Sequence, residues 1–250
     1  MLDLQVKEGI AWVTLQRPQV LNAINQEMAN LILGQIQELE KRTDVRVIIT
    51  RGAGRAFCAG SDLRELAPLS PGQAAAYELE VARIFSILDR LPQPTIAALH
   101  GHVLGGGLGL ALYHDFRVAS ETASLGMPEV ELGWIPPWAV GRLAEVVGLQ
   151  KARWILMTCA TMTGMEAAEI GLVDKAVPDQ QLLSCVEELA RRLATMPSEG
   201  IRRTKMLVNR MSSLRRFDWD VTASEAFQEC YEKPEAQKKI ADFLASKKKG

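Results

Sequence analysis

Residues 100–111 read His100-Gly101-His102-Val103-Leu104-Gly105-Gly106-Gly107-Leu108-Gly109-Leu110-Ala111. The run follows Thr95–Leu99, a short segment typical of a buried strand, and it opens a helical pattern over Leu108–Tyr113. A strand that turns into a helix through glycines leaves backbone N–H groups free at the helix start, where they can bind an anion. The glycines alone are equally typical of a ligand-binding turn and of a tight packing turn.

The spacing of these glycines excludes the common nucleotide-binding loops. A dinucleotide fingerprint needs G-x-G-x-x-G/A, and a start at Gly105 or Gly107 puts Leu110 or Leu112 at the sixth position. The chain also contains no G-x-x-x-x-G-K-S/T loop and no G-x-S-x-G elbow. What remains is a turn whose backbone N–H can act as an oxyanion donor.

A second small-residue turn lies earlier in the chain, over Arg55-Ala56-Phe57-Cys58-Ala59-Gly60-Ser61-Asp62-Leu63. We expect 52–60 to be a loop that follows a strand over Val45–Thr50. The carboxyl ends of parallel strands meet at one edge of a sheet. The two turns would therefore lie close together, and one N–H from each could converge on a single carbonyl oxygen.

The rest of the chain predicts an α/β fold with mainly parallel strands, because strands alternate with helices. Further strands are expected over Ile10–Leu15 and Phe116–Ala119, and helices over Asn25–Arg42, Ala74–Leu88 and Leu182–Met196. Asn25 is the expected N-cap of the first helix. Helical patterns alone follow residue 195, so we predict an α/β core over 1–195 and a helical oligomerisation region over 196–250.

Composition narrows the class of protein. Of the 250 residues 48% are hydrophobic, and 29 Lys and Arg balance 30 Asp and Glu, which is unlike a nucleic-acid-binding protein. No segment predicts a membrane span. The four cysteines lie far apart without a C-x-x-C pair, so we expect a reducing, cytoplasmic location. His100 and His102 have only His114 as a possible third ligand, and we expect no metal.

Three segments resemble the enoyl-CoA hydratase/isomerase (crotonase) family: 55–63, 101–107 and Phe116–Gly133. The segments Leu15–Ala23 and Ala167–Asp174 also resemble the family, and the likeness runs from about Thr14 to Pro178, with a loose fit in the helical tail. The resemblance implies a spiral of ββα units with a helical C-terminal region, assembled as a homotrimer or a dimer of trimers. It also implies an acyl-CoA thioester as substrate and an enolate as intermediate.

The resemblance assigns roles to particular residues. The N–H groups of Ser61 and Gly106 would hold the thioester oxygen, and Glu129 would be a catalytic carboxylate. The CoA-side loop would comprise Ala59, Ser61, Asp62 and Leu63 together with Gly106. No cofactor is expected beyond the coenzyme A of the substrate, and no nucleic acid or membrane partner. The sequence places no base beside the Ser61 hydroxyl, so we do not expect a serine nucleophile.

One departure from the family decides the expected reaction. Hydratases of the family use two glutamates, and one of these positions is Gly109 here, while the other is Glu129. A single base suffices for Δ3-Δ2-enoyl-CoA isomerisation, which we therefore favour. The alternatives are an enoyl-CoA hydratase, another family reaction such as hydrolysis or decarboxylation, and a non-catalytic CoA-binding protein.

Several side chains near the expected site allow two interpretations each. Trp134 and Trp138 would either exclude water from the site or serve as ordinary core aromatics. Glu131 would either replace the missing acid or lie in solvent. His102 and His114 would be pocket groups or packing histidines. The basic side chains of the tail would contact CoA phosphates or form a solvated helix face; they are Arg202, Arg203, Lys205 and Arg210.

Overall fold

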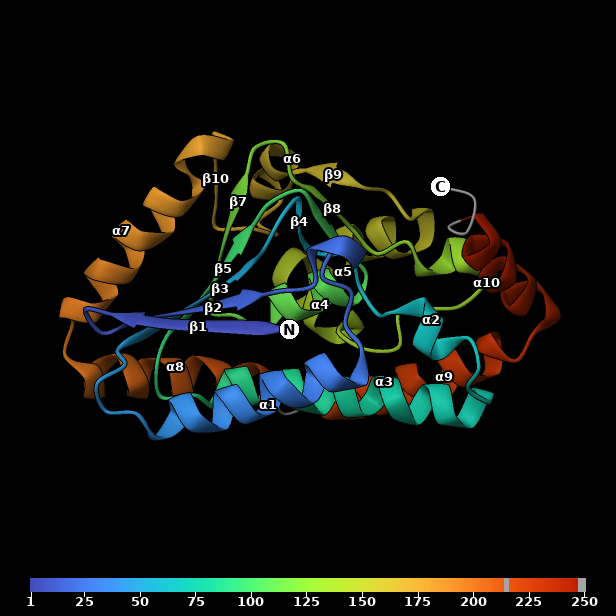
Figure 1. Cartoon of the computed structure of the whole chain (residues 1–250), viewed down its shortest axis with the longest axis horizontal. Helices are drawn as coiled ribbons and strands as arrows, with labels where there is room; N and C mark the ends of the chain where they lie inside the picture. Colours follow the sequence, from blue (N-terminus) through green and yellow to red (C-terminus); the bar gives the residue numbers. More distant parts are fainter. Residues whose placement is uncertain (214–215, 247–250) are drawn as a thin grey trace.

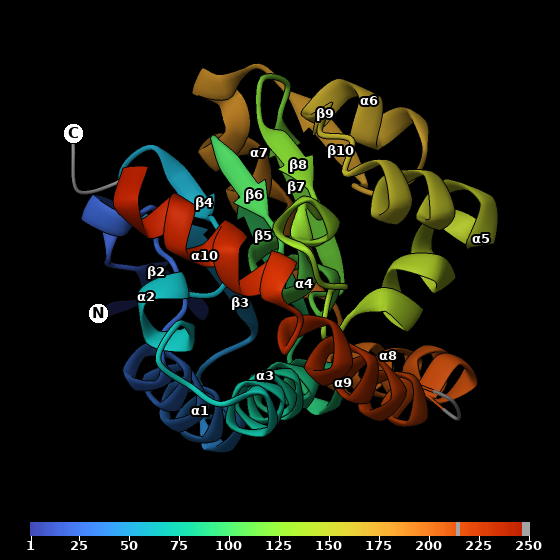
Figure 2. The same ribbon diagram turned by 90° about the vertical axis from the view of Figure 1, so that its right-hand side faces the viewer.

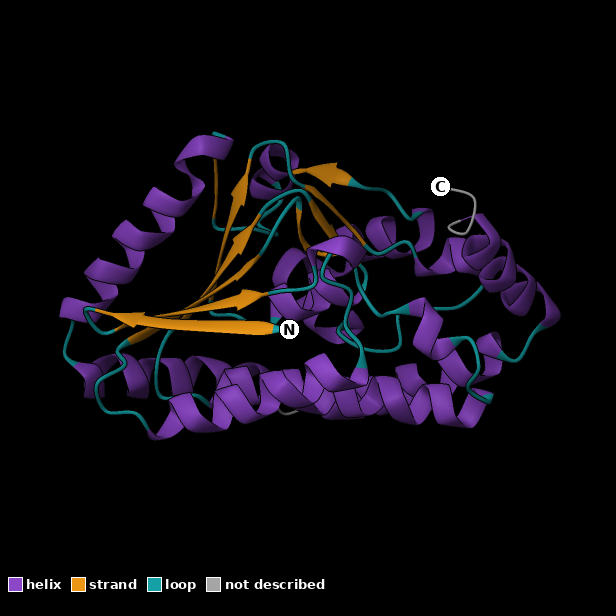
Figure 3. Cartoon of the chain, viewed as in Figure 1, coloured by secondary structure: helices purple, strands orange, loops and turns teal. Residues whose placement is uncertain are grey.

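Two β-sheets form the interior of the molecule, and helices surround them (Figures 1 and 3). The computed structural model describes residues 1–213 and 216–246. The larger sheet has the order β1 (Leu2–Lys7), β2 (Ile10–Leu15), β3 (Val47–Gly52), β5 (Thr95–Leu99), β7 (Phe116–Ser120) and β10 (Lys175–Val177). The smaller sheet has the order β4 (Ala56–Cys58), β6 (His102–Leu104), β8 (Ser124–Gly126) and β9 (Met162–Thr163).

Most neighbouring strands are parallel, as the alternation of strands and helices predicts. In the larger sheet only the pairing of β1 with β2 is antiparallel, and in the smaller sheet only that of β8 with β9, among the described residues. Strands β2 and β5 have the predicted limits. Helix α1 (Gln26–Lys41) begins after Asn25, whose side-chain oxygen accepts a hydrogen bond of 3.0 Å from the N–H of Met28. The expected N-cap is confirmed.

The chain repeats one pattern three times: a strand of the larger sheet, a strand of the smaller sheet, and then helix. β3 and β4 precede α2 (Leu63–Leu66) and α3 (Pro71–Ser86), β5 and β6 precede α4 (Gly106–Leu112), and β7 and β8 precede η3 (Glu129–Leu132) and α5 (Val140–Thr158). This confirms the expected ββα spiral. Each repeat therefore places a turn after a strand of the smaller sheet, and β4, β6 and β8 are neighbours (Figure 2).

The expectation that 52–60 forms a loop is wrong in part, because β4 lies inside that segment and pairs with β6. The turns that we placed after strands of one large sheet follow strands of the second, smaller sheet. A three-residue strand is too short to show a repeating pattern of hydrophobic residues. The strand is recognised only in the structure, where it pairs with β6 and where the side chains of Phe57 and Cys58 are fully buried.

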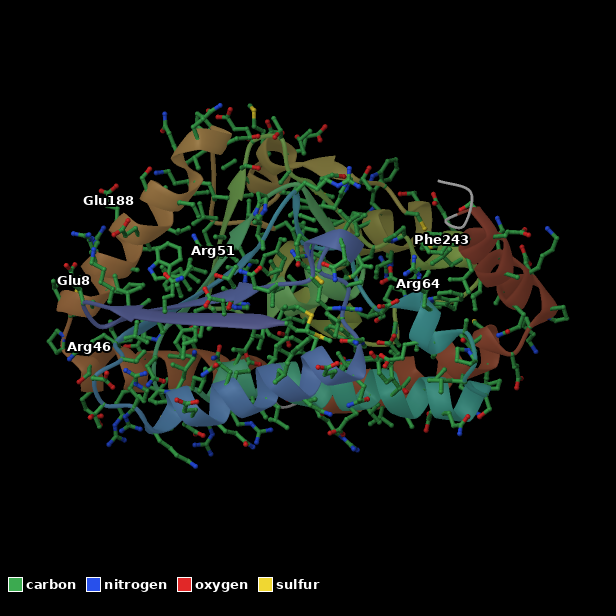
Figure 4. The ribbon with its side chains drawn as sticks, viewed as in Figure 1. Glu8, Arg46, Arg51, Arg64, Glu188 and Phe243 are labelled. Atoms are coloured by element: carbon green, nitrogen blue, oxygen red, sulfur yellow. The ribbon has the colours of Figure 1, made fainter. Side chains whose placement is uncertain are left out.

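One face of the larger sheet packs against α7 (Leu182–Thr195), as Figure 1 shows. Ile49 and Ile96 contribute to this layer from the strands, and Val186 and Ala190 contribute from α7. Glu188 projects outward from the other side of that helix (Figure 4). This alternation is the amphipathic pattern that predicted the helix.

The C-terminal helices pack on the core. They are α8 (Ser198–Ser213), α9 (Arg216–Tyr231) and α10 (Pro234–Ser246). Helix α9 lies along α3 (Figure 2), where the Ser224 hydroxyl donates a hydrogen bond of 2.9 Å to Ala75 O. Tyr231 OH donates one of 2.6 Å to Leu66 O. Phe227 and Tyr231 belong to the main hydrophobic cluster. The helical character after residue 195 is thus confirmed, while the domain boundary there stays a prediction.

Short elements complete the chain: η1 (Pro18–Val20), η2 (Ile87–Arg90), α6 (Gly164–Glu169) and η4 (Asp179–Gln181). None of the described helices is both long enough and apolar enough to span a membrane.

Candidate active site

Three turns meet at the carboxyl edge of the smaller sheet and enclose a cavity of about 80 Å³. They follow β4, β6 and β8 and carry, in that order, Ser61, Gly106 and Glu129. The site thus arises from the ββα repeat. The lining residues are Ala59, Gly60, Ser61, Leu63, Leu66, Glu78, Gly105, Gly106, Gly109, Met127, Pro128, Glu129, Leu132, Trp134, Pro137 and Trp138.

Gly60 and Gly105 allow the first two turns to touch. Their φ angles are +102° and +52°, in the region that favours glycine. A Cβ atom on Gly60 would lie 3.3 Å from the backbone nitrogen of Gly106. The N–H of Gly105 donates a hydrogen bond of 2.9 Å to Gly126 O, which ties the second turn to the third. The two turns therefore come together as the sequence predicts.

The two expected donors lie side by side. Gly106 is the first residue of α4, so its N–H has no acceptor within the helix. A Cβ on Gly106 would lie 3.6 Å from the backbone nitrogen of Ser61. Within the described part of the chain, neither N–H donates a hydrogen bond to another residue. Both remain available for an oxygen atom in the cavity.

Glu129 begins η3 and is the first carboxyl group of the site. Its side chain lies against the second turn, because a Cβ on Gly105 would be 2.7 Å from Glu129 Oε1. Glu129 is 9% exposed, and its Oε2 has no hydrogen-bond partner among the described residues. Burial and, to a smaller extent, the nearby charge of Glu78 together raise the pKa of Glu129 to about 8. Such a carboxyl group is tuned for proton transfer near neutral pH.

Glu78 is a second carboxyl group of the cavity, and no sequence motif indicated it. It lies on α3, is 2% exposed, and accepts a hydrogen bond of 2.8 Å from Trp138 Nε1. The Ser61 side chain lies near Glu78 and lowers its pKa, so a carboxyl group that the sequence did not place lies close to this hydroxyl. Burial raises the pKa of Glu78.

A signal for Glu78 was present in the helix over 74–88. The buried positions of α3 recur with helical spacing, and Glu78 falls among them, next to Tyr77 and one turn after Ala74 and Ala75. A carboxyl group on the apolar face of a helix is rare unless it has a partner or a function. Helical spacing could therefore have pointed to Glu78, although not to the cavity that it enters.

Both tryptophans line the cavity and also belong to the core. The Trp138 ring packs on Phe85 and Tyr113, with ring centroids 5.5 and 6.3 Å apart. Trp134 packs on Phe227 and Tyr231 of α9, at 6.0 and 5.6 Å. Trp134 and Trp138 are therefore core aromatics and at the same time form an apolar wall of the cavity, so the two interpretations from the sequence are compatible.

Trp138 also occupies the space beside Gly109. A Cβ atom at Gly109 would lie 2.8 Å from Cη2 of this ring and closer still to Cζ3, distances at which the ring would have to shift. The glycine is thus required by packing. The carboxyl group that a hydratase of the family would carry at this position has no room here.

We expect Gly109→Ala to lower the free energy of unfolding by about 1–3 kcal/mol, because an added atom overpacks the buried site. Gly109→Glu should lower the free energy of unfolding further, and its carboxyl group should not act as a catalytic acid. Gly34→Ala on α1 is the control, since a Cβ there meets nothing within 4 Å. It should stabilise the helix by about 0.5–1 kcal/mol. Urea unfolding measures both, and a Gly109→Ala protein as stable as wild type would contradict this packing.

The other residues of the expected CoA-side loop occupy different places. Ala59 and Leu63 line the cavity, whereas Asp62 does not. Asp62 Oδ2 forms an ion pair of 2.9 Å with Arg17 Nη2, and its Oδ1 accepts a hydrogen bond from the N–H of Arg64 at the start of α2. Asp62 therefore anchors this loop to the N-terminal part of the chain.

Glu131 and the histidines lie outside the cavity. Glu131 is exposed, so it is not the missing acid. His114 is fully buried, with Nε2 2.8 Å from Thr50 Oγ1, and burial lowers its pKa to about 4; it is a packing histidine. His102 is exposed on β6. No cluster of ligands suited to a metal ion occurs in the described ranges.

The basic side chains of the tail are engaged elsewhere. Lys205 Nζ is buried, 2.7 Å from Asp115 Oδ2 and 3.0 Å from Gln93 O. Arg202 and Arg203 both form ion pairs of 2.6 Å with Glu199. None of these side chains lines the cavity.

Comparison with known proteins places this geometry in context. The sequence model of the enoyl-CoA hydratase/isomerase family matches residues 5–249. A short-chain-enoyl-CoA hydratase of Clostridium acetobutylicum is 32% identical over 97% of this chain and 94% of its own. An enoyl-CoA isomerase/hydratase of Mycosarcoma maydis is 34% identical, over 80% of this chain and 77% of its own. A solved structure of an enoyl-CoA hydratase/isomerase from Xanthobacter autotrophicus superimposes with a TM-score of 0.89 at 29% identity, over 99% of this chain and 93% of that one.

Proposed function

The chain belongs to the enoyl-CoA hydratase/isomerase family, and from that premise we propose that it isomerises a 3-enoyl-CoA to a 2-enoyl-CoA through a thioester enolate. Two observations support an enolate. The N–H groups of Ser61 and Gly106 lie together without acceptors among the described residues, where they can hold a negatively charged oxygen. Glu129 lies in the same cavity and acts as the base.

The observation that carries the proposal is the Glu129 carboxyl group, buried with one oxygen free and with a pKa of about 8. It removes a proton from C2 of the substrate, and the electron pair moves into the thioester carbonyl. When the enolate collapses, the Glu129 O–H bond breaks, its proton forms the new C4–H bond, and the double bond moves from C3–C4 to C2–C3. Trp134 and Trp138 line the cavity with apolar surface, which disfavours attack by water at C3.

Hydration of a 2-enoyl-CoA is the second candidate. It is favoured by the presence of Glu78, because hydration needs one group to activate water and another to protonate carbon. The name of the Clostridium relative also points to hydration. A decarboxylase or hydrolase acting on another acyl-CoA would use the same oxyanion donors.

The purified protein should be given a 3-enoyl-CoA and crotonyl-CoA in parallel, with both products measured by mass spectrometry and nuclear magnetic resonance. We expect faster formation of the 2-enoyl-CoA than of the 3-hydroxyacyl-CoA. Brisk hydration without isomerisation would replace the first candidate with the second. Binding of acetyl-CoA in a calorimeter, without turnover of any acyl-CoA, would instead identify a non-catalytic CoA-binding protein.

The proposal extends to the cofactor, the oligomeric state and the location of the protein. We propose that coenzyme A enters only as part of the substrate, with no separate cofactor. We also propose a homotrimer or a dimer of trimers. Large apolar side chains exposed on α5 give it an apolar surface: Leu149, Trp154 and Met157. Sedimentation velocity would decide the oligomeric state. The cytoplasmic location rests on the cysteine pattern alone.

A further inference from the structure

We propose that the indole ring of Trp138 closes the inner end of the cavity and restricts the substrate to thioesters with an acyl chain of about four carbons. This inference deepens the proposed function and rests on it, because it takes the thioester oxygen to lie at the N–H groups of Ser61 and Gly106. Trp138 thereby determines which acyl chain is accepted, a role distinct from excluding water.

The cavity has a partly exposed rim and a buried inner end. The lining residues that are partly exposed, and so form the rim, include Ala59, Leu63, Pro128 and Leu132. Those that are buried at the inner end include Leu66, Glu78, Trp134 and Trp138. Coenzyme A is far too large for this cavity and stays outside the rim. The acyl chain of a bound thioester therefore points toward the buried end.

The six-membered edge of the Trp138 ring lies directly beside the position of the thioester carbonyl group. A Cβ atom on Gly106 would lie 3.2 Å from Cζ2 of this ring, and a Cβ on Gly109, one turn along α4, would lie 2.8 Å from Cη2. Trp134 packs instead on Phe227 and Tyr231 of α9. An acyl chain whose carbonyl oxygen is held at Gly106 thus meets the Trp138 ring before any other aromatic wall.

Contacts on several sides hold the Trp138 ring in place. Its Nε1 donates a hydrogen bond of 2.8 Å to Glu78 Oε2, and the residue is only 2% exposed. Phe85 packs edge-on against the ring at 5.5 Å, and Tyr113 stacks on it at 6.3 Å. Displacing the ring would break a buried hydrogen bond and disturb close packing, both of which are unfavourable. The ring therefore does not move aside to admit a longer chain.

The volume of the cavity agrees with a short acyl chain. It is about 80 Å³, whereas a cavity of about 150 Å³ in a protein interior holds the six carbons of benzene. About three or four carbon atoms therefore fit, which is enough for C1 to C4 of a 3-enoyl thioester. One methylene group too many in a closed pocket typically lowers kcat/KM by about 10–200-fold.

The chain-length preference tests this assignment. With 3-enoyl-CoAs of four, six and eight carbons, kcat/KM of the wild type should fall by at least about tenfold from four carbons to six, and again to eight. Trp138→Leu removes the ring and opens the inner end. The ratio of kcat/KM for six carbons to that for four should then rise by about tenfold or more. An unchanged ratio in a folded Trp138→Leu protein would overturn the proposal.

Three further variants control for folding and for the identity of the wall. Trp138→Phe keeps an aromatic ring in the core and preserves the test if Trp138→Leu does not fold; the ratio should rise by a smaller factor. Trp12→Leu is the matched control, because Trp12 lies on β2 and does not line the cavity, so the wild-type ratio should persist. A larger rise for Trp134→Leu than for Trp138→Leu would overturn the assignment to Trp138.

Binding of saturated acyl-CoAs gives a readout that does not depend on turnover. In a calorimeter the wild type should bind butyryl-CoA at least about tenfold more tightly than octanoyl-CoA, and Trp138→Leu should remove most of this difference. Equal affinities in the wild type would overturn the inference even if isomerisation proceeds. If the preference is present and shifts in Trp138→Leu but no 3-enoyl-CoA is isomerised, the proposed function fails while the role of Trp138 is supported.

Discussion

Replacing Glu129 by Gln should abolish most of the activity, with a loss of about 10²–10⁴ in kcat. The amide has nearly the same size as the carboxyl group, so it should fit beside Gly105 and leave the cavity intact. It cannot accept a proton from carbon. Because the oxyanion donors are unchanged, substrate binding should persist and KM should stay close to the wild-type value.

The pH dependence gives this prediction a second readout. Glu129 has a pKa of about 8, so below that pH it is protonated and cannot act as the base. The wild-type rate should rise with pH through about 8 and then level off, and Glu129→Gln should lose this dependence. Glu131→Gln is the matched control, because Glu131 lies in the same short helix and is exposed. Full turnover of a 3-enoyl-CoA by Glu129→Gln would disprove the base role.

The sequence contains enough information to predict the main strands and helices of this fold. The apolar runs of β2 and β5 and the capped helix α1 are long or regular enough to be read directly, and the ββα spiral followed from the family likeness. The smaller sheet was missed because β4, β6 and β8 have three residues each. Such strands exist through pairing with distant segments, which local patterns do not report.

The site, too, contains features that depend on contacts between distant segments and could not be predicted from local sequence. Ser61, Gly106 and Glu129 could be found because the segments that contain them resemble the family. Glu78 could not be placed, since it is far from the other three in sequence and enters the cavity only through the packing of α3. The sequence shows directly that position 109 carries no carboxyl group. The reason is the Trp138 ring, which occupies the space beside Gly109, and such a tertiary contact cannot be inferred from the sequence.

Removing the N–H of Gly106 should lower kcat by about 10²–10³, the usual cost of losing one oxyanion donor. Gly106→Pro achieves this, because proline has no N–H. Gly106 is the first residue of α4, a position at which proline is well tolerated in helices. The enolate oxygen would retain only the Ser61 donor. Kinetics on a 3-enoyl-CoA measure the effect, and circular dichroism and thermal unfolding report whether the fold persists.

Gly106→Ala separates the lost donor from the added bulk. It keeps the N–H and adds a Cβ that would lie 3.2 Å from Trp138 Cζ2, so the ring needs to move by only a few tenths of an ångström. We therefore expect a much smaller loss for alanine than for proline. Equal losses would mean that the space beside Trp138 matters and the donor does not. A large loss for proline alone, in a folded protein, would show that the reaction depends on charge developing at the thioester oxygen, which every reaction proposed for this cavity requires.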